Sequence, residues 1–167
     1  MHTLTRPVKF IPWLAALISL PLMASGAHDH GAGKLDVTIE KDRITINLEL
    51  PLDVLVGFER APRNDKERQA LTAAGAKLKD GATLFSPTPA AACKLTKAEL
   101  SLPFAEGAKA APGEHADADA SYEFACAQPK DLVGIETTLF KQFSRLYRLE
   151  TQRVGPTGQG GGRLTPK

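Results

Sequence analysis

The sequence predicts an α+β protein that is mostly antiparallel β, a sandwich or a curled sheet of about six or seven strands, with one helix and one disulfide. Three observations support this fold class. Short segments of alternating apolar and polar residues dominate the chain, one segment alone has convincing helical spacing, and the chain has two cysteines, Cys93 and Cys126. The connections between the segments are short or irregular, which favours antiparallel pairing over helical crossovers.

The first 27 residues predict a secretory signal peptide. Arg6 and Lys9 form a positive start, residues 10–23 are largely apolar, and small residues follow at 24–27. The apolar run is short for a membrane span and ends in cleavage chemistry, although an uncleaved anchor is the alternative. Residues 28–167 would then form a single β-rich domain, exported and not membrane-spanning.

Charge and cysteine content narrow the class of protein. Without Arg6 and Lys9, the chain has 19 basic and 19 acidic residues, interspersed along the sequence. This balance argues against a nucleic-acid-binding protein, which would show a basic stripe. In an exported protein, Cys93 and Cys126 most simply form one disulfide, worth about 3 to 4 kcal/mol in the chain-entropy model. A cysteine metal site is the less favoured alternative because there is no CxxC spacing.

The first elements are predicted by periodicity. Segments 34–40 and 43–50 alternate with period two around Lys41 and Asp42, which predicts a β-hairpin with one apolar side. Pro51 interrupts the pairing, and 51–65 has no clean period, so we expect a connector there.

The helix is predicted over 64–81. Asn64 is a good N-cap, Glu67 completes a capping box, and Gly81 can end the helix. One apolar face repeats with helical spacing and is formed by Leu71, Ala74 and Leu78.

The second half of the chain reads as extended segments and loops. Two prolines make 83–102 extended, and a change of phase predicts a bulge near Thr96. The range 103–119 carries no period and is expected to be a flexible loop. Further strands are predicted at 120–126, 134–140 and 146–154, the first with Cys126 on its apolar face.

The glycine-rich range 155–162 is predicted to be a hairpin turn. A phosphate-binding loop would need a helix directly after the glycines, and too few residues remain for one. There is no GxSxG motif, and Asp117 and Asp119 fall in the predicted loop, where catalytic groups would lack rigid support. The sequence therefore predicts a protein that is not an enzyme.

The best candidate metal ligands are His28 and His30. Imidazole is the commonest protein ligand for Zn²⁺ and Cu²⁺, and residues two apart in an extended chain point the same way. A closed zinc site needs roughly four ligands. If the 103–119 loop folds back, it could supply the remaining candidates, Glu114, His115 and Asp117. The alternative is a solvated leader with incidental histidines.

The position of signal cleavage decides whether the mature N-terminus could chelate Cu²⁺ or Ni²⁺. Cleavage after Ala27 leaves His28 first and His30 at position three. A free amine followed by a histidine at position three is a strong chelator of Cu²⁺ or Ni²⁺ through the intervening backbone nitrogens. Cleavage after Gly26 removes this geometry.

Six stretches, taken in order along the chain, resemble a known family: "HDHGAGKLDVTIE", "LVGFERAPRND", "CKLTKAELSL", "SYEFACAQP", "GIETTLFKQF" and "LETQRVGPTGQGGGRLTP". Together they resemble the ZrgA-like family of periplasmic zinc-binding proteins, over nearly all of the chain after the signal. The resemblance implies a periplasmic protein, produced under zinc limitation, that assists zinc uptake. It also implies zinc as the bound metal and a zinc ABC transporter or its binding protein as partner.

The chain departs from that family in two places. Relatives often carry a long insert rich in histidine and aspartate, whereas the matching stretch here has His115 alone. The family commonly has histidine at the position of Arg60, whose guanidinium stays protonated and cannot bind a metal. We therefore expect reduced capacity, with one or two ions bound through His28, His30 and His115. The alternative is a β-rich interaction module without metal.

Overall fold

The computed structural model describes residues 31–105 and 116–167. The predicted signal peptide and the predicted ligands at positions 28, 30, 114 and 115 lie outside these ranges. No helix in the part described is long and apolar enough to cross a membrane.

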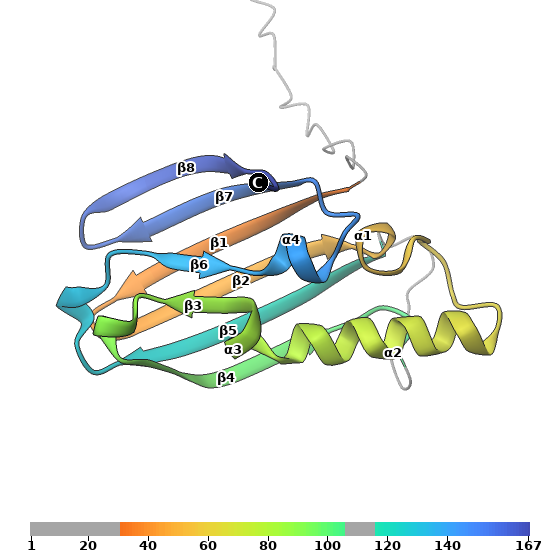
Figure 1. Ribbon diagram of the computed structural model, residues 1–167, viewed down its shortest axis with the longest axis horizontal. Coiled ribbons are helices and arrows are strands. Elements are labelled where there is room, and N and C mark those ends of the chain that lie inside the picture. Colours follow the sequence, from red (N-terminus) through yellow and green to blue (C-terminus); the bar gives the residue numbers. More distant parts are fainter. Residues whose placement is uncertain (1–30, 106–115) are drawn as a thin grey trace, which may run out of the picture.

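One layer of the fold is a six-stranded sheet with strand order β4-β5-β2-β1-β7-β8 (Figure 1). Its strands are β1 (Ala32–Glu40), β2 (Arg43–Pro51), β4 (Cys93–Ser101), β5 (Asp117–Cys126), β7 (Arg148–Gly155) and β8 (Gly158–Leu164). The predicted α+β class, with mostly antiparallel strands and one disulfide, is confirmed.

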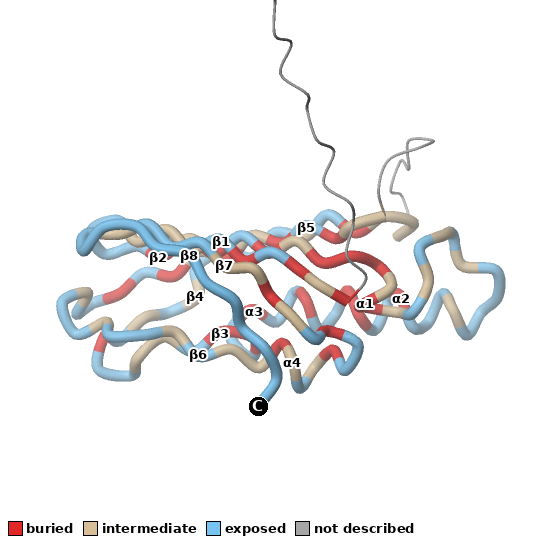
Figure 2. The backbone as a smooth tube through the Cα atoms, turned by 90° about the horizontal axis from the view of Figure 1, so that it is seen from above, coloured by how far each residue is buried: buried red, intermediate tan, exposed pale blue. Residues whose placement is uncertain are grey.

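A second layer covers one face of the sheet, and Figure 2 shows the two layers from above. It contains a small antiparallel sheet of β3 (Phe85–Pro87) and β6 (Ile135–Thr137). The helices are α1 (Leu52–Val56), α2 (Asp65–Lys79), α3 (Gly81–Leu84) and α4 (Leu139–Gln142), with short 3₁₀ turns η1 (Pro89–Ala91) and η2 (Pro129–Asp131).

The predicted hairpin is formed by β1 and β2, which turn at Lys41 and Asp42. Lys41 has φ 54°, a left-handed conformation that this tight turn requires. Period-two alternation places every second residue of β2 on the covered face of the sheet. Those residues are all buried and form the centre of the core: Ile44, Ile46, Leu48 and Leu50.

β7 pairs with β1 in parallel, which is the one parallel pairing among the described strands. The sequence favoured antiparallel pairing, and the difference arises from the route of the chain. After β5 the chain runs along the second layer through η2, β6 and α4 before it enters the sheet again beside β1 (Figure 1). A parallel pair requires this kind of long connection.

α2 confirms the predicted helix and packs on the sheet with Leu71, Ala74 and Leu78, which are buried. The side chain of Asn64 caps it by accepting a hydrogen bond from the Glu67 amide at 2.9 Å. The helix ends at Lys79, before the Gly81 predicted to end it. Gly81 instead begins α3, where a Cβ atom would lie 2.4 Å from the Tyr122 ring.

Tyr122 joins the sheet to the second layer. Its side chain is 0 % exposed, and its hydroxyl donates a hydrogen bond of 2.6 Å to the Leu78 carbonyl at the end of α2. The ring lies 5.2 Å from the ring of Phe85, measured between centroids. Burial raises the pKa of the Tyr122 phenol, so the hydroxyl stays protonated and remains a donor.

The β4–β5 hairpin is closed by the Cys93–Cys126 disulfide, whose cysteines are direct partners in the two strands. The pairing register shifts between Leu95 and Lys97, which confirms the bulge predicted near Thr96. β5 begins at Asp117, three residues before the predicted start at position 120. Asp117 and Asp119 therefore lie in a strand, where the sequence placed them in a loop.

Several short elements were not predicted. The connector 51–65 contains α1, the segment 134–140 divides into β6 and the start of α4, and most of the glycine-rich range forms β8. The 3₁₀ turn η2 was not predicted either, and the range 83–102, predicted to be extended throughout, contains the end of α3 and the 3₁₀ turn η1. The hairpin turn predicted over 155–162 is limited to its first residues, since Gly155 already pairs with Gly158. Glycine has no side chain to alternate, so β8 shows no period even though its backbone completes a full ladder with β7.

Candidate metal site

Asp117 is the one predicted ligand within the described residues, where it begins β5 and pairs with Pro51 at the end of β2. The described residues contain no group of three or more histidine, cysteine or acidic side chains placed to hold a metal ion. The positions of the described residues next to the predicted ligands are informative, because peptide geometry limits where each ligand can lie.

Gly31 is the chain neighbour of His30, and it is held beside the start of β7. Its carbonyl accepts a hydrogen bond of 3.0 Å from the Tyr147 amide. Its φ is 77°, and a Cβ atom at this position would lie 2.4 Å from the Tyr147 ring. Glycine is therefore required for both backbone and packing, and it fixes the point from which the residues before it continue.

Ala116 is the chain neighbour of His115, and it is fixed in a similar way. Its carbonyl accepts a hydrogen bond of 2.9 Å from the Leu52 amide, at the first residue of α1. This bond lies where β2 ends and β5 begins.

Gly31 and Ala116 lie at the same end of the sheet. β1 and β5 are the two neighbours of β2 and both run antiparallel to it, so their first residues lie on either side of the end of β2 (Figure 1). Two strand spacings of about 4.8 Å separate them by roughly 10 Å across the sheet. The two described residues that adjoin the histidine-bearing stretches of sequence therefore lie close together.

The outer face of the sheet is acidic near this end. Glu49 is paired with Lys34 on one side and with Asp119 on the other, so two carboxylates lie on adjacent strands. Lys34 Nζ contacts Glu49 Oε1 at 2.7 Å. The face is hollowed here by a depression of about 580 Å³ whose acidic lining is formed by Asp36, Glu49, Glu99 and Asp119.

The pKa values of two residues on this face are raised. The hydrogen bond to Glu49 raises the pKa of Lys34, with smaller contributions from Asp117 and Asp36. Desolvation raises the pKa of Asp119, and the charge of Glu49 raises it further. Such a surface attracts cations, and carboxylate oxygens are accepted ligands of zinc. Glu49 and Asp119 were not predicted as site residues, because only the strand register places them side by side.

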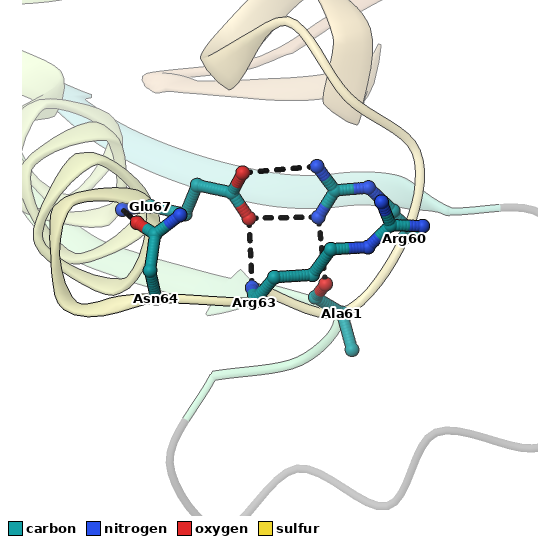
Figure 3. Close-up of polar contacts among 5 residues, drawn as sticks. All are labelled: Arg60, Ala61, Arg63, Asn64 and Glu67. Atoms are coloured by element: carbon teal, nitrogen blue, oxygen red, sulfur yellow. Dashed lines mark hydrogen bonds and ion pairs between the residues drawn. The ribbon is translucent and has the colours of Figure 1, made fainter.

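Arg60, at the position where the resembling family has histidine, is engaged in an ion pair (Figure 3). Its Nη1 and Nη2 contact the two carboxylate oxygens of Glu67 at 2.7 and 2.9 Å. Glu67 also accepts a hydrogen bond of 2.7 Å from the Arg63 amide. The Glu67 carboxylate thus accepts from the amide of Arg63, the residue before the N-cap, where the predicted capping box would have it accept from the Asn64 amide. With Arg60 it holds the connector against the start of α2.

The ion pair of Glu67 with Arg60 is expected to contribute to stability in a pH-dependent way. The hydrogen bonds from Arg60 and Arg63 lower the pKa of Glu67 from its ordinary value to about 2. A lowered folded-state pKa contributes stability above the unfolded pKa, and this contribution is lost as pH falls toward about 2. Glu67→Gln should therefore lower the melting temperature at pH 6, and the difference from the native protein should vanish near pH 2.

Thermal unfolding followed between about pH 2 and pH 6 measures this effect. Arg60→Gln is the matched control, because in that background Glu67→Gln should lower the melting temperature less than in the native protein. A Glu67→Gln difference that stays constant across this pH range would show that the carboxylate charge is not involved.

Comparison with known proteins agrees with the resemblance drawn from the sequence. The family model described as "ZrgA family zinc uptake protein" matches residues 27–167, which include every helix and strand of the fold. A search of curated proteins found no match. Because the matched range covers most of the chain, the protein belongs to the ZrgA family of zinc uptake proteins.

Proposed function

We propose that this protein is a non-enzymatic, periplasmic zinc-binding accessory protein that assists zinc uptake. Membership of a zinc uptake family supports the role in uptake. The Cys93–Cys126 disulfide supports export, because disulfides persist in oxidising compartments such as the bacterial periplasm. The signal-like first 27 residues support the same compartment. A zinc ABC transporter or its binding protein is the proposed partner.

The proposed zinc site lies at the end of the sheet where β1 and β5 begin. The observation that carries it is the placement of Gly31 and Ala116 on either side of the end of β2. His30 and His115 each immediately precede one of these anchored residues in the sequence, and Cα atoms joined by one peptide unit are about 3.8 Å apart. Zinc lies about 2.0 to 2.1 Å from a histidine nitrogen, so side chains from both stretches have the reach to share one ion.

The remaining proposed ligands are His28 and a carboxylate, either Glu114 or Asp117. Asp117 is held by its pairing with Pro51 and lies two residues from Asp119 on the acidic face. With three histidines outside the predicted signal, the proposed capacity is one or two ions. This is a smaller capacity than the insert-bearing relatives would have.

Isothermal titration of the mature protein with Zn²⁺ tests the proposal. We expect a dissociation constant below about 1 μM near pH 7.5, weakening as the imidazoles protonate between about pH 7 and pH 5. His28→Ala combined with His30→Ala should abolish this binding, and His115→Ala should weaken it by about tenfold or more. A similar loss in either Glu114→Gln or Asp117→Asn should identify the carboxylate ligand. Asp42→Asn, at the opposite end of the hairpin, is the matched control and should leave the affinity unchanged.

Two outcomes would contradict the zinc site. Absence of zinc binding at neutral pH would leave a β-rich interaction module without metal. Retention of full affinity in the double histidine variant would place zinc elsewhere. Terminal sequencing with copper titration addresses the remaining alternative, since tight Cu²⁺ or Ni²⁺ binding by a chain that starts at His28 would indicate an amine-histidine chelate.

A further inference from the structure

A groove of about 1150 Å³ opens between the covered face of the sheet and the strand β6 with the segment before it. It exceeds the roughly 300 to 1000 Å³ that is usual for small-ligand pockets. Its walls are largely aliphatic and include Leu35, Val37, Ile39, Leu132, Ile135 and Leu164. Val133, also in the lining, is 87 % exposed. The second layer thus leaves part of the apolar face uncovered, on the side of β1, β7 and β8 (Figure 2).

The glycines of β8 help to keep this groove open. Gly162 pairs with Thr151, and Gly160 pairs with Arg153, so these glycines share the face on which Thr151, Arg153 and Leu164 line the groove. A Cβ atom at Gly162 would meet Thr151 Oγ1 at 3.5 Å, an ordinary contact, and Gly160 has similar room. Larger residues would fit the strand here, yet they would extend into the space beside the groove.

The basic residues of the lining lie at one end of the groove. Lys41 is in the β1–β2 turn, Lys130 is in η2, and Arg153 is near the end of β7; these segments meet at the end of the sheet opposite α1 (Figure 1). All three side chains are exposed, and none forms an ion pair with another described residue. Asp42 is the one acidic residue of the lining, so the end is net positive.

We propose that this groove binds one long-chain aliphatic carboxylate, with its hydrocarbon chain on the apolar walls and its carboxylate at Lys41, Lys130 and Arg153. The arrangement fits an amphipathic anion, because apolar contacts run along the groove and cations stand at one end. An arginine can hold a carboxylate through two parallel hydrogen bonds. A peptide fits less well, since its amide groups would need partners along the whole groove. The site is independent of the proposed zinc site.

Titration of the mature protein with hexadecanoate, below its micelle concentration, tests this proposal. We expect one molecule bound per chain, with affinity rising along the series from dodecanoate to hexadecanoate as more methylenes are buried. Gly162→Leu should weaken binding by about tenfold or more, because its side chain competes for the apolar walls. Gln159→Leu places the same side chain on the opposite face of β8 and should bind as the native protein does.

Arg153→Gln tests the polar end. This change should weaken the binding of hexadecanoate by about tenfold, because a charge-assisted hydrogen bond is lost. The binding of hexadecanol, which has no carboxylate, should be unchanged. Gly162 and Gln159 lie in the exposed edge strand β8, and Arg153 is an exposed residue of β7, so the melting temperatures of these variants should match that of the native protein. Failure of hexadecanoate to bind would overturn the proposal. The proposal would also be overturned if Gly162→Leu and Gln159→Leu weakened hexadecanoate binding equally. It would be overturned as well if Arg153→Gln weakened the binding of hexadecanoate and of hexadecanol equally.

Discussion

Replacing Cys93 by serine is expected to lower the free energy of unfolding by about 3 to 4 kcal/mol. The disulfide joins residues 33 positions apart, so its loss restores a large set of conformations to the unfolded chain. It also joins the edge strand β4 to β5 at the side of the core, where Cys126 is 3 % exposed. For a domain of this size, the melting temperature should fall by about 10 °C or more.

Thermal unfolding with and without a reducing agent measures this effect and provides its control. Reduction should lower the melting temperature of the native protein to near that of Cys93→Ser, and it should leave Cys93→Ser unchanged. Equal melting temperatures for the oxidised and reduced native protein would mean that the disulfide contributes nothing to stability.

Replacing Tyr122 by alanine is expected to cost about 3 to 5 kcal/mol, because a fully buried ring at the junction of the sheet with α2 and α3 is removed. Tyr122→Phe separates the hydroxyl from the ring. It keeps the packing against Phe85 and leaves the Leu78 carbonyl without its donor, at a cost of about 1 to 3 kcal/mol. Urea unfolding of the two variants gives both values on one scale.

A double-mutant cycle with Gly81 provides the control for Tyr122. Gly81→Ala alone should be destabilising, since its Cβ would lie 2.4 Å from the Tyr122 ring. In the Tyr122→Ala background the same change should cost much less, because the atom it meets is gone. Additive costs would show that the ring is not the obstacle at this position.

The elements that could be predicted from the sequence are those with local signals. The β1–β2 hairpin follows from period-two alternation, α2 from the Asn64 cap and its apolar face, and the bulge near Thr96 from a change of phase. α1 and α4 have five and four residues, too few to establish a helical period. The parallel pairing of β1 with β7 depends on residues more than a hundred positions apart, which no local pattern reports.

The candidate sites show the same division. Asp117 could be named from its nearness to His115 in the sequence, yet its place in a strand rather than a loop required the structure. The adjacency of Glu49 and Asp119 depends on the β2–β5 register. That Arg60 is no metal ligand follows from its chemistry, whereas its bond to Glu67 depends on how the connector folds against α2. The groove brings together the β1–β2 turn, η2, β6 and β7, which no motif connects.

The position of the disulfide within the β4–β5 hairpin bears on how this architecture accommodates changes in chain length. Cys93 and Cys126 close one end of the ladder, and the chain between Ser101 and Asp117 leaves from the other end. Each doubling of the length of a loop costs only about 0.6 kcal/mol of closure entropy. Evolution or an engineer can therefore lengthen this connection, including with metal-binding repeats, while the covalent closure keeps the strand register in place.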